Sequence, residues 1–201
     1  MKNKSVIPNS FRNLLFTTIV LLIALGVNCA GSVLAESLHI PLYLDSLSTI
    51  GVTALCGLLP GVLCAILSNV VLSFFGYNMI PFAICHVLTA FFAHLTFRHY
   101  KNDMLSQKRF TLEPFLWASL WSGLSNGILG GIIADIVFSL ITGVPKADFM
   151  VKAIFIAVEN LKVATYLTGL VENLCDKTIS AVVSFAIYRI GVHVVKTPNY
   201  R

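Results

Sequence analysis

The sequence alternates long apolar stretches with short polar segments. The stretch from Leu14 to Ala35 contains 22 residues, and about 20 are enough for a helix to cross the hydrocarbon core of a bilayer. Comparable stretches occupy residues 80–97, 115–141 and 170–188. Helices that are apolar on every side are typical of a protein core or a membrane. The pattern therefore predicts at least four membrane-spanning helices.

Residues 46–75 form a less regular apolar stretch, which is too long for one simple span. The segment from Gly57 to Gly61, Gly-Leu-Leu-Pro-Gly, interrupts it. A proline inside a helix removes a hydrogen bond and clashes with the preceding turn. The segment predicts either a kink or a turn between two short helices.

Basic residues decide between these alternatives, because they favour the cytoplasmic side of a membrane. They form three blocks: Lys2, Lys4 and Arg12; Arg98, Lys101, Lys108 and Arg109; Arg189, Lys196 and Arg201. These blocks share one side only if the irregular stretch holds two helices, at about 46–59 and 61–75. The prediction is an all-α integral membrane protein with six transmembrane helices and both termini in the cytoplasm.

The composition agrees with this prediction. Hydrophobic residues make up 57% of the 201 residues and charged residues 11%, whereas about a quarter of a soluble domain is charged. The net charge of +5 is explained by orientation in the lipid bilayer, so nucleic acid is not an expected partner. The length suits one membrane domain over residues 1–201.

Three segments face outward in this topology, namely residues 36–46, 75–81 and 142–169. The third is not a plain loop, because apolar residues recur at helical spacing between Asp148 and Lys162. It predicts a helix that lies at the membrane interface.

Several polar residues lie inside the predicted helices, where ionisable groups are costly unless they face the bundle interior or water. In the last helix, Glu172, Asn173, Asp176 and Lys177 share one helical face. Glu172 and Asp176 repel each other at this spacing, and Lys177 can partly neutralise them. Two interpretations stay open: an internal ion-pair network that holds the last helix, or a ligand site.

The ligand-site interpretation is favoured, because the three outward segments converge with these residues. The candidate substrate-binding residues are Asp45, Tyr77, Asn78, His86, Asp135, Asn160, Lys162, Tyr166, Glu172, Asn173, Asp176 and Lys177. Asn69 and Asn126 are further polar residues in apolar helices.

The sequence gives little support for catalysis or for a bound metal. His86 and His94 lie eight residues apart, and we interpret them as core residues that satisfy hydrogen bonds. No zinc-protease, serine-hydrolase or phosphate-loop motif is present, and no pair among the five cysteines has the C-x-x-C spacing. We expect no catalytic residue, no metal and no other cofactor.

The first predicted helix has a surface of small residues, formed by Ala24, Gly26, Asn28, Ala30 and Gly31. Spacings such as Gly26-x-x-x-Ala30 let another helix approach closely. That helix belongs either to the same bundle or to a partner membrane protein.

The order of these features resembles the substrate-binding S components of energy-coupling factor (ECF) transporters. The similar features are the small-residue first helix, Pro-x-Tyr-Leu-Asp-Ser-x-x-Thr-Ile at residues 41–50, the Gly57-x-x-x-Gly61 hairpin, Ser68-Asn69, and Asn-Leu-x-Asp-Lys-x-Ile-Ser at residues 173–180. They cover nearly the whole chain.

The resemblance implies a non-catalytic subunit in the cell membrane of a prokaryote. Such a subunit binds a vitamin or cofactor precursor outside, docks on a transmembrane coupling protein and topples to release the substrate inside. Two ABC ATPase subunits of the transporter hydrolyse the ATP. The family's docking face carries Ala-x-x-x-Ala, for which this sequence has Ala24-x-x-x-Asn28.

Other functions also stay open, namely a stand-alone membrane sensor that signals to a regulator, or a membrane enzyme. The substrate is open as well. Asp135, Glu172 and Asp176 suit a ligand with a cationic or hydrogen-bond-donating ring, whereas Lys162 and Lys177 suit a carboxylate or phosphate. The residues that could stack on an aromatic ring, or anchor the chain at the interface, are Tyr43, Tyr77, Phe149 and Tyr166.

Overall fold

The computed structural model of the protein describes residues 9–76, 79–101, 109–142 and 145–194. These residues form seven α-helices and no strand, which confirms the all-α prediction. The helices are α1 (Asn9–Ser37), α2 (Thr49–Cys56), α3 (Leu58–Phe74), α4 (Ala83–His99), α6 (Glu113–Phe138), α7 (Pro145–Val158) and α8 (Leu161–Val194).

The last helix is longer than the apolar pattern indicates. It begins at Leu161 rather than near residue 170. The predicted range of 170–188 would place Glu172–Lys177 at the beginning of the last helix, but this stretch lies near the middle of α8. The helix predicted between Asp148 and Lys162 is present as α7 and ends at Val158.

The irregular stretch contains two helices, as the basic residues predict. Gly57 separates α2 from α3 with a φ of 93°, a backbone conformation that glycine adopts without steric cost. Pro60 is the third residue of α3, where a helix has no internal partner for its N–H groups. The proline therefore lies in the first turn of a helix and does not kink one.

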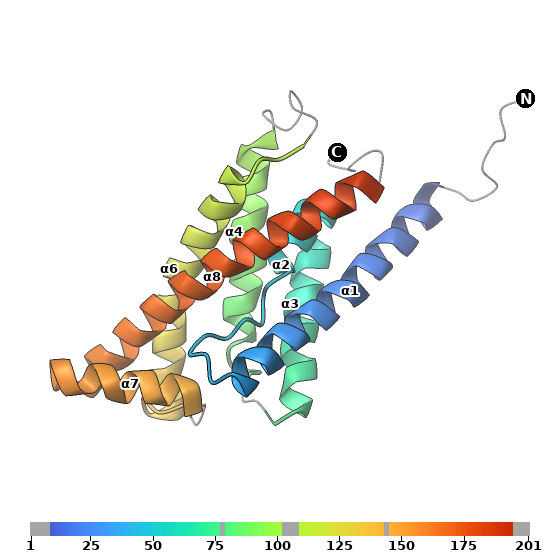
Figure 1. Ribbon diagram of the computed structural model, residues 1–201. Coiled ribbons are helices and arrows are strands. Elements are labelled where there is room, and N and C mark those ends of the chain that lie inside the picture. Colours follow the sequence, from blue (N-terminus) through green and yellow to red (C-terminus); the bar gives the residue numbers. More distant parts are fainter. Residues whose placement is uncertain (1–8, 77–78, 102–108, 143–144, 195–201) are drawn as a thin grey trace, which may run out of the picture.

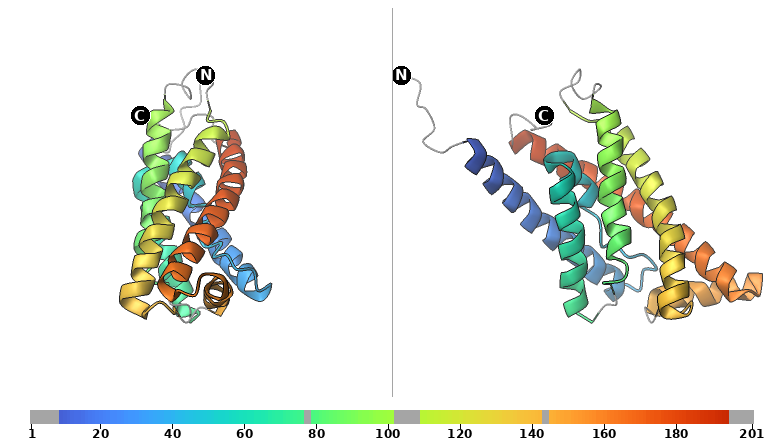
Figure 2. Two further views of the ribbon diagram at one scale, coloured as in Figure 1. Left: turned by 90° about the vertical axis from the view of Figure 1, so that its left-hand side faces the viewer. Right: turned by 180° about the vertical axis from the view of Figure 1, so that it is seen from behind.

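The helices form an elongated bundle in which α6 and α8 run side by side (Figure 1). The helix α4 packs on α6, and α2 packs on α3, α4 and α8. The helix α1 lies along one side against α2 and α3, and α7 crosses one end of the bundle against α8 (Figures 1 and 2). The start of α1 and the end of α8 both lie at the other end.

Glycines allow the close approach of α6 and α8. A Cβ on Gly127 would lie 2.7 Å from the Cα of Leu170, and one on Gly123 would lie 3.1 Å from the Cα of Leu174. Small residues at a spacing of four let two helix backbones approach closely. This contact fixes the half of α8 that carries Glu172 and Lys177.

An aromatic cluster closes the bundle at the end where α8 terminates. Phe97, Phe110, Phe115 and Tyr188 are buried there, and the ring centroid of Phe97 lies 4.8 Å from that of Phe110 and 4.8 Å from that of Phe115. The backbone N–H of Phe110 donates to the hydroxyl of Tyr188 at 3.0 Å. The core at this end is therefore filled.

Two of the described helices have the length and apolar composition to cross a membrane, Asn13–Ser37 within α1 and Glu113–Phe138. The second of the six predicted transmembrane helices is too short to cross a membrane, because α2 has eight residues and extends about 12 Å. Seven of its residues, Thr49 to Leu55, are buried. This helix therefore packs inside the protein.

Candidate functional site

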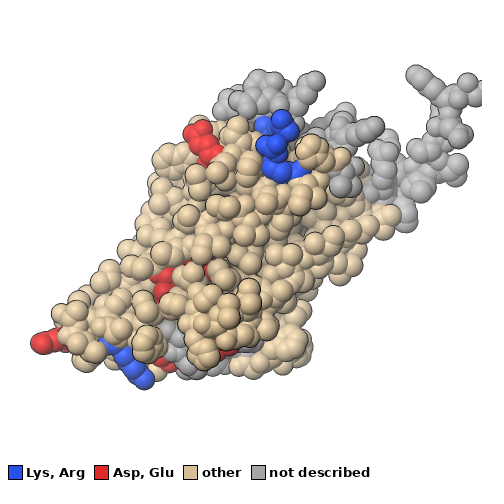
Figure 3. Space-filling view, viewed as in Figure 1, with Lys and Arg blue, Asp and Glu red and all other residues tan. Residues whose placement is uncertain are grey.

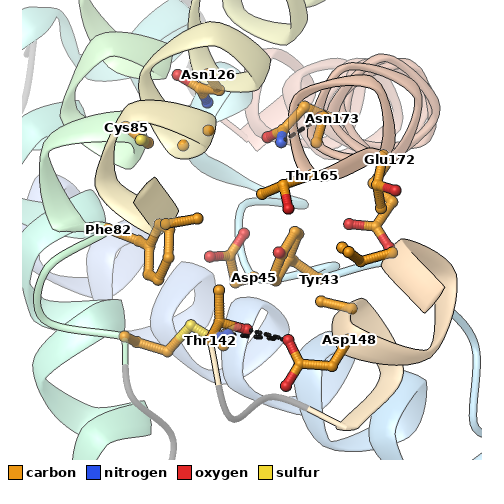
Figure 4. Close-up of a pocket in the computed structure, with 18 of the residues that line it drawn as sticks. Tyr43, Asp45, Phe82, Cys85, Asn126, Thr142, Asp148, Thr165, Glu172 and Asn173 are labelled. Carbon is orange, nitrogen blue, oxygen red and sulfur yellow. Dashed lines mark hydrogen bonds between the residues drawn. The ribbon is translucent and has the colours of Figure 1, made fainter. Parts of the chain in front are cut away.

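A cavity lies at the α7 end of the bundle. Its walls come from the loop at residues 38–48, the beginning of α4, the second half of α6, α7 and the first half of α8 (Figure 4). The space between the lining atoms, including the opening to solvent, is about 700 Å³. Segments far apart in the sequence thus enclose one volume.

The structure brings together five of the predicted substrate-binding residues. The cavity is lined by Asp45, His86, Glu172, Asn173 and Lys177. Five other predicted residues do not line it, namely Asp135, Asn160, Lys162, Tyr166 and Asp176. Tyr77 and Asn78 lie outside the described residues.

Lys177 and Asp176 join α8 to the loop that forms one wall. The Lys177 ammonium donates to Asp176 Oδ2 at 2.5 Å and to Ser46 Oγ at 2.7 Å, and it lies 3.6 Å from Asp45 Oδ1. The backbone N–H of Leu44 donates to Asp176 Oδ1 at 2.6 Å. Asp176 is fully buried behind the wall. The two interpretations of this stretch are therefore not exclusive, because the ion-pair network forms part of the cavity wall.

His86 is held in a fixed orientation from both ring nitrogens. The Asn69 amide donates to Nδ1 at 2.8 Å, and Nε2 lies 2.6 Å from Thr49 Oγ1. Since Nδ1 accepts a hydrogen bond, the proton resides on Nε2 and the ring is neutral. His86 is therefore a buried residue with hydrogen bonds at both ring nitrogens, as the sequence predicts, and it also lines the cavity.

Asn28 connects this network to α1. The backbone N–H and hydroxyl of Ser48 donate to Asn28 Oδ1 at 2.9 and 2.7 Å. The Asn28 amide donates to Thr49 Oγ1 at 3.2 Å and to Ser68 Oγ at 3.0 Å. A chain of buried hydrogen bonds thus runs from α1 through Thr49 to His86.

The proposed docking face of the first helix is split between the interior and the surface. Ala24, Asn28 and Gly31 are buried in the bundle, whereas Gly26 and Ala30 are exposed. A Cβ on Gly31 would meet the carbonyl oxygen of Leu44. The prediction of a common docking surface is corrected here: the buried residues pack the bundle, and the exposed two are open to a partner.

The α7 side of the cavity is built around Asp148. Its Oδ1 accepts hydrogen bonds from the Thr142 backbone N–H at 2.9 Å and from the Thr142 hydroxyl at 3.0 Å. This contact fastens α7 to the segment that follows α6 (Figure 4). α7 therefore forms part of the cavity wall.

Tyr43 places a neutral phenol beside the acidic groups of the cavity (Figure 4). Burial raises the pKa of Tyr43 well above its ordinary value, and the carboxylates of Glu172 and Asp45 raise that pKa further. The phenol therefore stays protonated and can donate a hydrogen bond. The sequence indicates Tyr43 as a residue able to stack, but not its proximity to Glu172.

Asn126 and Thr168 also line the cavity but are absent from the predicted set. The Asn126 amide donates to Thr89 Oγ1 at 2.9 Å, while its Oδ1 has no hydrogen-bond partner. The Thr168 hydroxyl has none either. An asparagine in an apolar helix is a signal that could have found Asn126. The sequence offers no comparable signal for Thr168, since a helical threonine usually bonds its own backbone.

Asp135 and Lys162 form an ion pair in which Lys162 Nζ lies 2.5 Å from Asp135 Oδ2. Neither residue lines the cavity. Asn160 accepts a hydrogen bond at 3.0 Å from the Val163 backbone N–H and so stabilises the beginning of α8. The Tyr166 ring packs where a Cβ on Gly131 would lie. Asp135, Lys162 and Tyr166 thus connect α6 to α8, whereas Asn160 caps the beginning of α8.

Taken together, the site is a partly enclosed cavity with acidic, amide, hydroxyl and aromatic groups in its walls. The described residues contain no group of three His, Cys, Asp or Glu side chains that could hold a metal ion. Such an arrangement can bind and orient a small polar molecule. No family model, curated protein or solved structure matches this chain.

Proposed function

We propose that this chain is the substrate-binding S component of an ECF-type importer in a prokaryotic cell membrane. Its cavity captures a vitamin or cofactor precursor outside the cell, and a coupling protein with two ABC ATPase subunits drives release inside. The observation that carries the proposal is the cavity of buried polar groups at one end of an apolar helix bundle.

The apolar surface supports a membrane location. Large hydrophobic side chains are exposed along α1, α3, α4, α6 and α8, including Leu22, Ile136 and Ile190. In Figure 3, Lys, Arg, Asp and Glu gather near both ends of the molecule, and a broad band with few charges lies between them. Contiguous apolar surface of this extent is unusual for a soluble monomer.

The distribution of basic residues supports an outward-facing cavity. Arg98, Lys101, Arg109 and Arg189 lie near the end of α4, the beginning of α6 and the end of α8, opposite the cavity. Positive residues favour the cytoplasm. The predicted basic residues Lys2, Lys4, Lys108, Lys196 and Arg201 lie outside the described residues.

The cavity walls give ligand binding a route to the rest of the molecule. A ligand there would contact the loop at residues 38–48, α7 and α8 together. It would shift the population of conformers only by as much as it prefers one arrangement of these segments. The exposed Gly26 and Ala30 of α1 supply a close-approach surface for the coupling protein in this proposal.

Coexpression with the coupling protein and the two ATPase subunits of the same cell tests the proposal. We expect the four proteins to purify together, and uptake of the ligand to stop when the gene for the coupling protein is deleted. A stand-alone sensor would not need to associate with the coupling protein. Uptake that continues without the coupling protein would refute the proposal.

Labelling in intact cells tests the orientation. In a variant without the five native cysteines, Lys152→Cys on α7 should react with a membrane-impermeant maleimide. Arg109→Cys, at the beginning of α6, is the matched control and should react only after the cells are opened. Both residues are exposed, so the reverse pattern of labelling would invert the proposed topology.

A further inference from the structure

We propose that the cavity binds a compact organic cation, a protonated amine or a cationic nitrogen ring on a small aromatic or apolar frame. This inference rests on the proposed function and names the class of substrate for the same cavity. Its support comes from the charge of the lining, the state of Lys177 and two buried polar groups without partners.

Among the described residues that line the cavity, acidic side chains outnumber basic ones. Asp45, Asp148 and Glu172 contribute three carboxylates, and Lys177 contributes one ammonium. A fourth carboxylate, that of Asp176, lies behind the wall and is fully buried. A cation close to such carboxylates stabilises their charged form where they are shielded from water, whereas an anion destabilises it.

Lys177 is already engaged by carboxylates. Its ammonium donates to Asp176 at 2.5 Å and lies 3.6 Å from Asp45. A phosphate or carboxylate ligand would compete with these groups for Lys177 and would bring a further negative charge to them. Loss of one partner from a buried ion pair is strongly unfavourable, so the cavity disfavours an anion.

Asn126 and Thr168 point independently to a ligand. Asn126 is 2% exposed and Thr168 is 1% exposed, and Asn126 Oδ1 and the Thr168 hydroxyl lack a hydrogen-bond partner. Buried polar atoms are nearly always paired in native structures. Both groups line the cavity, where a ligand can satisfy them, and the carbonyl oxygen of Asn126 suits the N–H donors of a cation.

The acidic groups are distributed around the cavity and do not meet at one point. Figure 4 shows Asp45, Glu172 and Asp148 on different sides of Tyr43, with Phe82 in the facing wall. No metal-binding group of three such side chains occurs among the described residues. Dispersed carboxylates fit a cation with a molecular frame, and the aromatic faces can contact that frame or its charge.

The effect of ligand charge on affinity can be measured with three aromatic fragments of similar size. They are benzylamine, which is a cation, benzyl alcohol, which is neutral, and benzoate, which is an anion. The full-length protein is purified in lipid nanodiscs, and the binding of each fragment is titrated by saturation-transfer NMR at pH 7. We expect benzylamine to bind about tenfold more tightly than either of the others, which corresponds to roughly 1.4 kcal/mol. Equal affinities, tighter binding of benzoate, or no binding of benzylamine would overturn the inference.

The Glu172→Gln variant tests the site, because it removes a charge and keeps the side-chain shape. We expect it to bring the affinities for benzylamine and benzyl alcohol to near equality. Glu113→Gln makes the same change in an exposed residue near the other end of the bundle and should leave the preference intact. A folded Glu172→Gln protein that keeps the full preference would contradict the inference. If this variant does not fold, the relative affinities of the three fragments for the unsubstituted protein still test the inference.

Mass spectrometry of small molecules retained on the purified chain separates this inference from the proposed function. We expect a compound that carries a cationic group at neutral pH. A retained anion without such a group would overturn the charge assignment and leave the transport role standing. Failure to associate with the coupling protein would instead refute the transport role, while the preference for benzylamine would persist.

Discussion

Asp176 and Lys177 are neighbours in the chain, and both direct their charged groups at one loop. The Asp176 carboxylate accepts the N–H of Leu44 at 2.6 Å, and the Lys177 ammonium donates to Ser46 at 2.7 Å. Both side chains are almost fully buried. Side chains of adjacent residues normally diverge on a helix, so the pair is held together by its 2.5 Å contact and by the loop.

The Asp176→Asn variant should therefore destabilise the fold before it affects a ligand directly. Removal of one partner from a buried ion pair typically lowers the free energy of unfolding by about 3–5 kcal/mol. Thermal unfolding of the protein in detergent measures the loss. The double variant Asp176→Asn/Lys177→Met is the control, and it should recover part of this stability because no unpaired ammonium remains. An Asp176→Asn protein as stable as the parent would show that the pair adds nothing to the fold.

Gly127 should tolerate no side chain, because α6 and α8 meet there. A Cβ would lie 2.7 Å from the Cα of Leu170, a backbone atom that cannot rotate away. We expect Gly127→Ala to separate the helices and to lower the free energy of unfolding by about 1–3 kcal/mol. The same measurement of thermal unfolding reports the change.

Gly130, three residues further along the same helix, provides the matched control. A Cβ there meets nothing within 4 Å, and alanine is favoured over glycine inside a helix by up to about 1 kcal/mol. Gly130→Ala should therefore leave stability unchanged or raise it. Equal destabilisation by both substitutions would mean that helix flexibility, and not the approach of α8, explains the glycines.

The helices and the turn at Gly57 could be predicted from the sequence, because hydrophobic stretches and the Gly-Leu-Leu-Pro-Gly segment mark them. The beginning of α8 could not. α7 ends at Val158, and the next residue, Glu159, has a φ of 53° and donates its backbone N–H to the carbonyl of Phe155 at 2.8 Å. This is a left-handed helix terminus of the kind that glycine usually forms, and a glutamate there gives no visible signal.

The candidate site could be predicted only in part, because tertiary contacts decide which partner each charged side chain meets. Glu172, Asn173 and Lys177 share a polar face, and helical periodicity is enough to identify it. Helical periodicity does not show which partner a charged side chain contacts. Lys162 pairs with Asp135, and Asp176 accepts a hydrogen bond from the loop at residues 38–48. Those choices depend on tertiary contacts between segments far apart in the sequence.

Substitutions at Asn28 and Gly26 should distinguish the part of α1 that stabilises the bundle from the part that contacts a partner. Asn28→Ala removes a buried group that bonds to Ser48, Thr49 and Ser68. We expect a loss of about 2–4 kcal/mol in the free energy of unfolding, since buried partners are left unpaired. Thermal unfolding measures this loss.

Gly26→Leu changes the exposed face of the same helix, where a Cβ meets nothing within 4 Å. It should unfold at the parent temperature and purify with less of the coupling protein, because the added side chain blocks close approach. The prediction for α1 fails if Gly26→Leu unfolds early, or if Asn28→Ala is fully stable and only loses the partner.

The last prediction concerns the ion pair between Asp135 and Lys162. Lys162 is largely exposed, and its pKa is raised by its hydrogen bond to Asp135. Exposed ion pairs contribute little to stability, and neither residue lines the cavity. We therefore expect Lys162→Met and Asp135→Asn each to keep the affinity for benzylamine within about twofold of the parent. A titration that shows a much larger loss for either variant would place this pair in contact with the ligand and would move the site towards the beginning of α8.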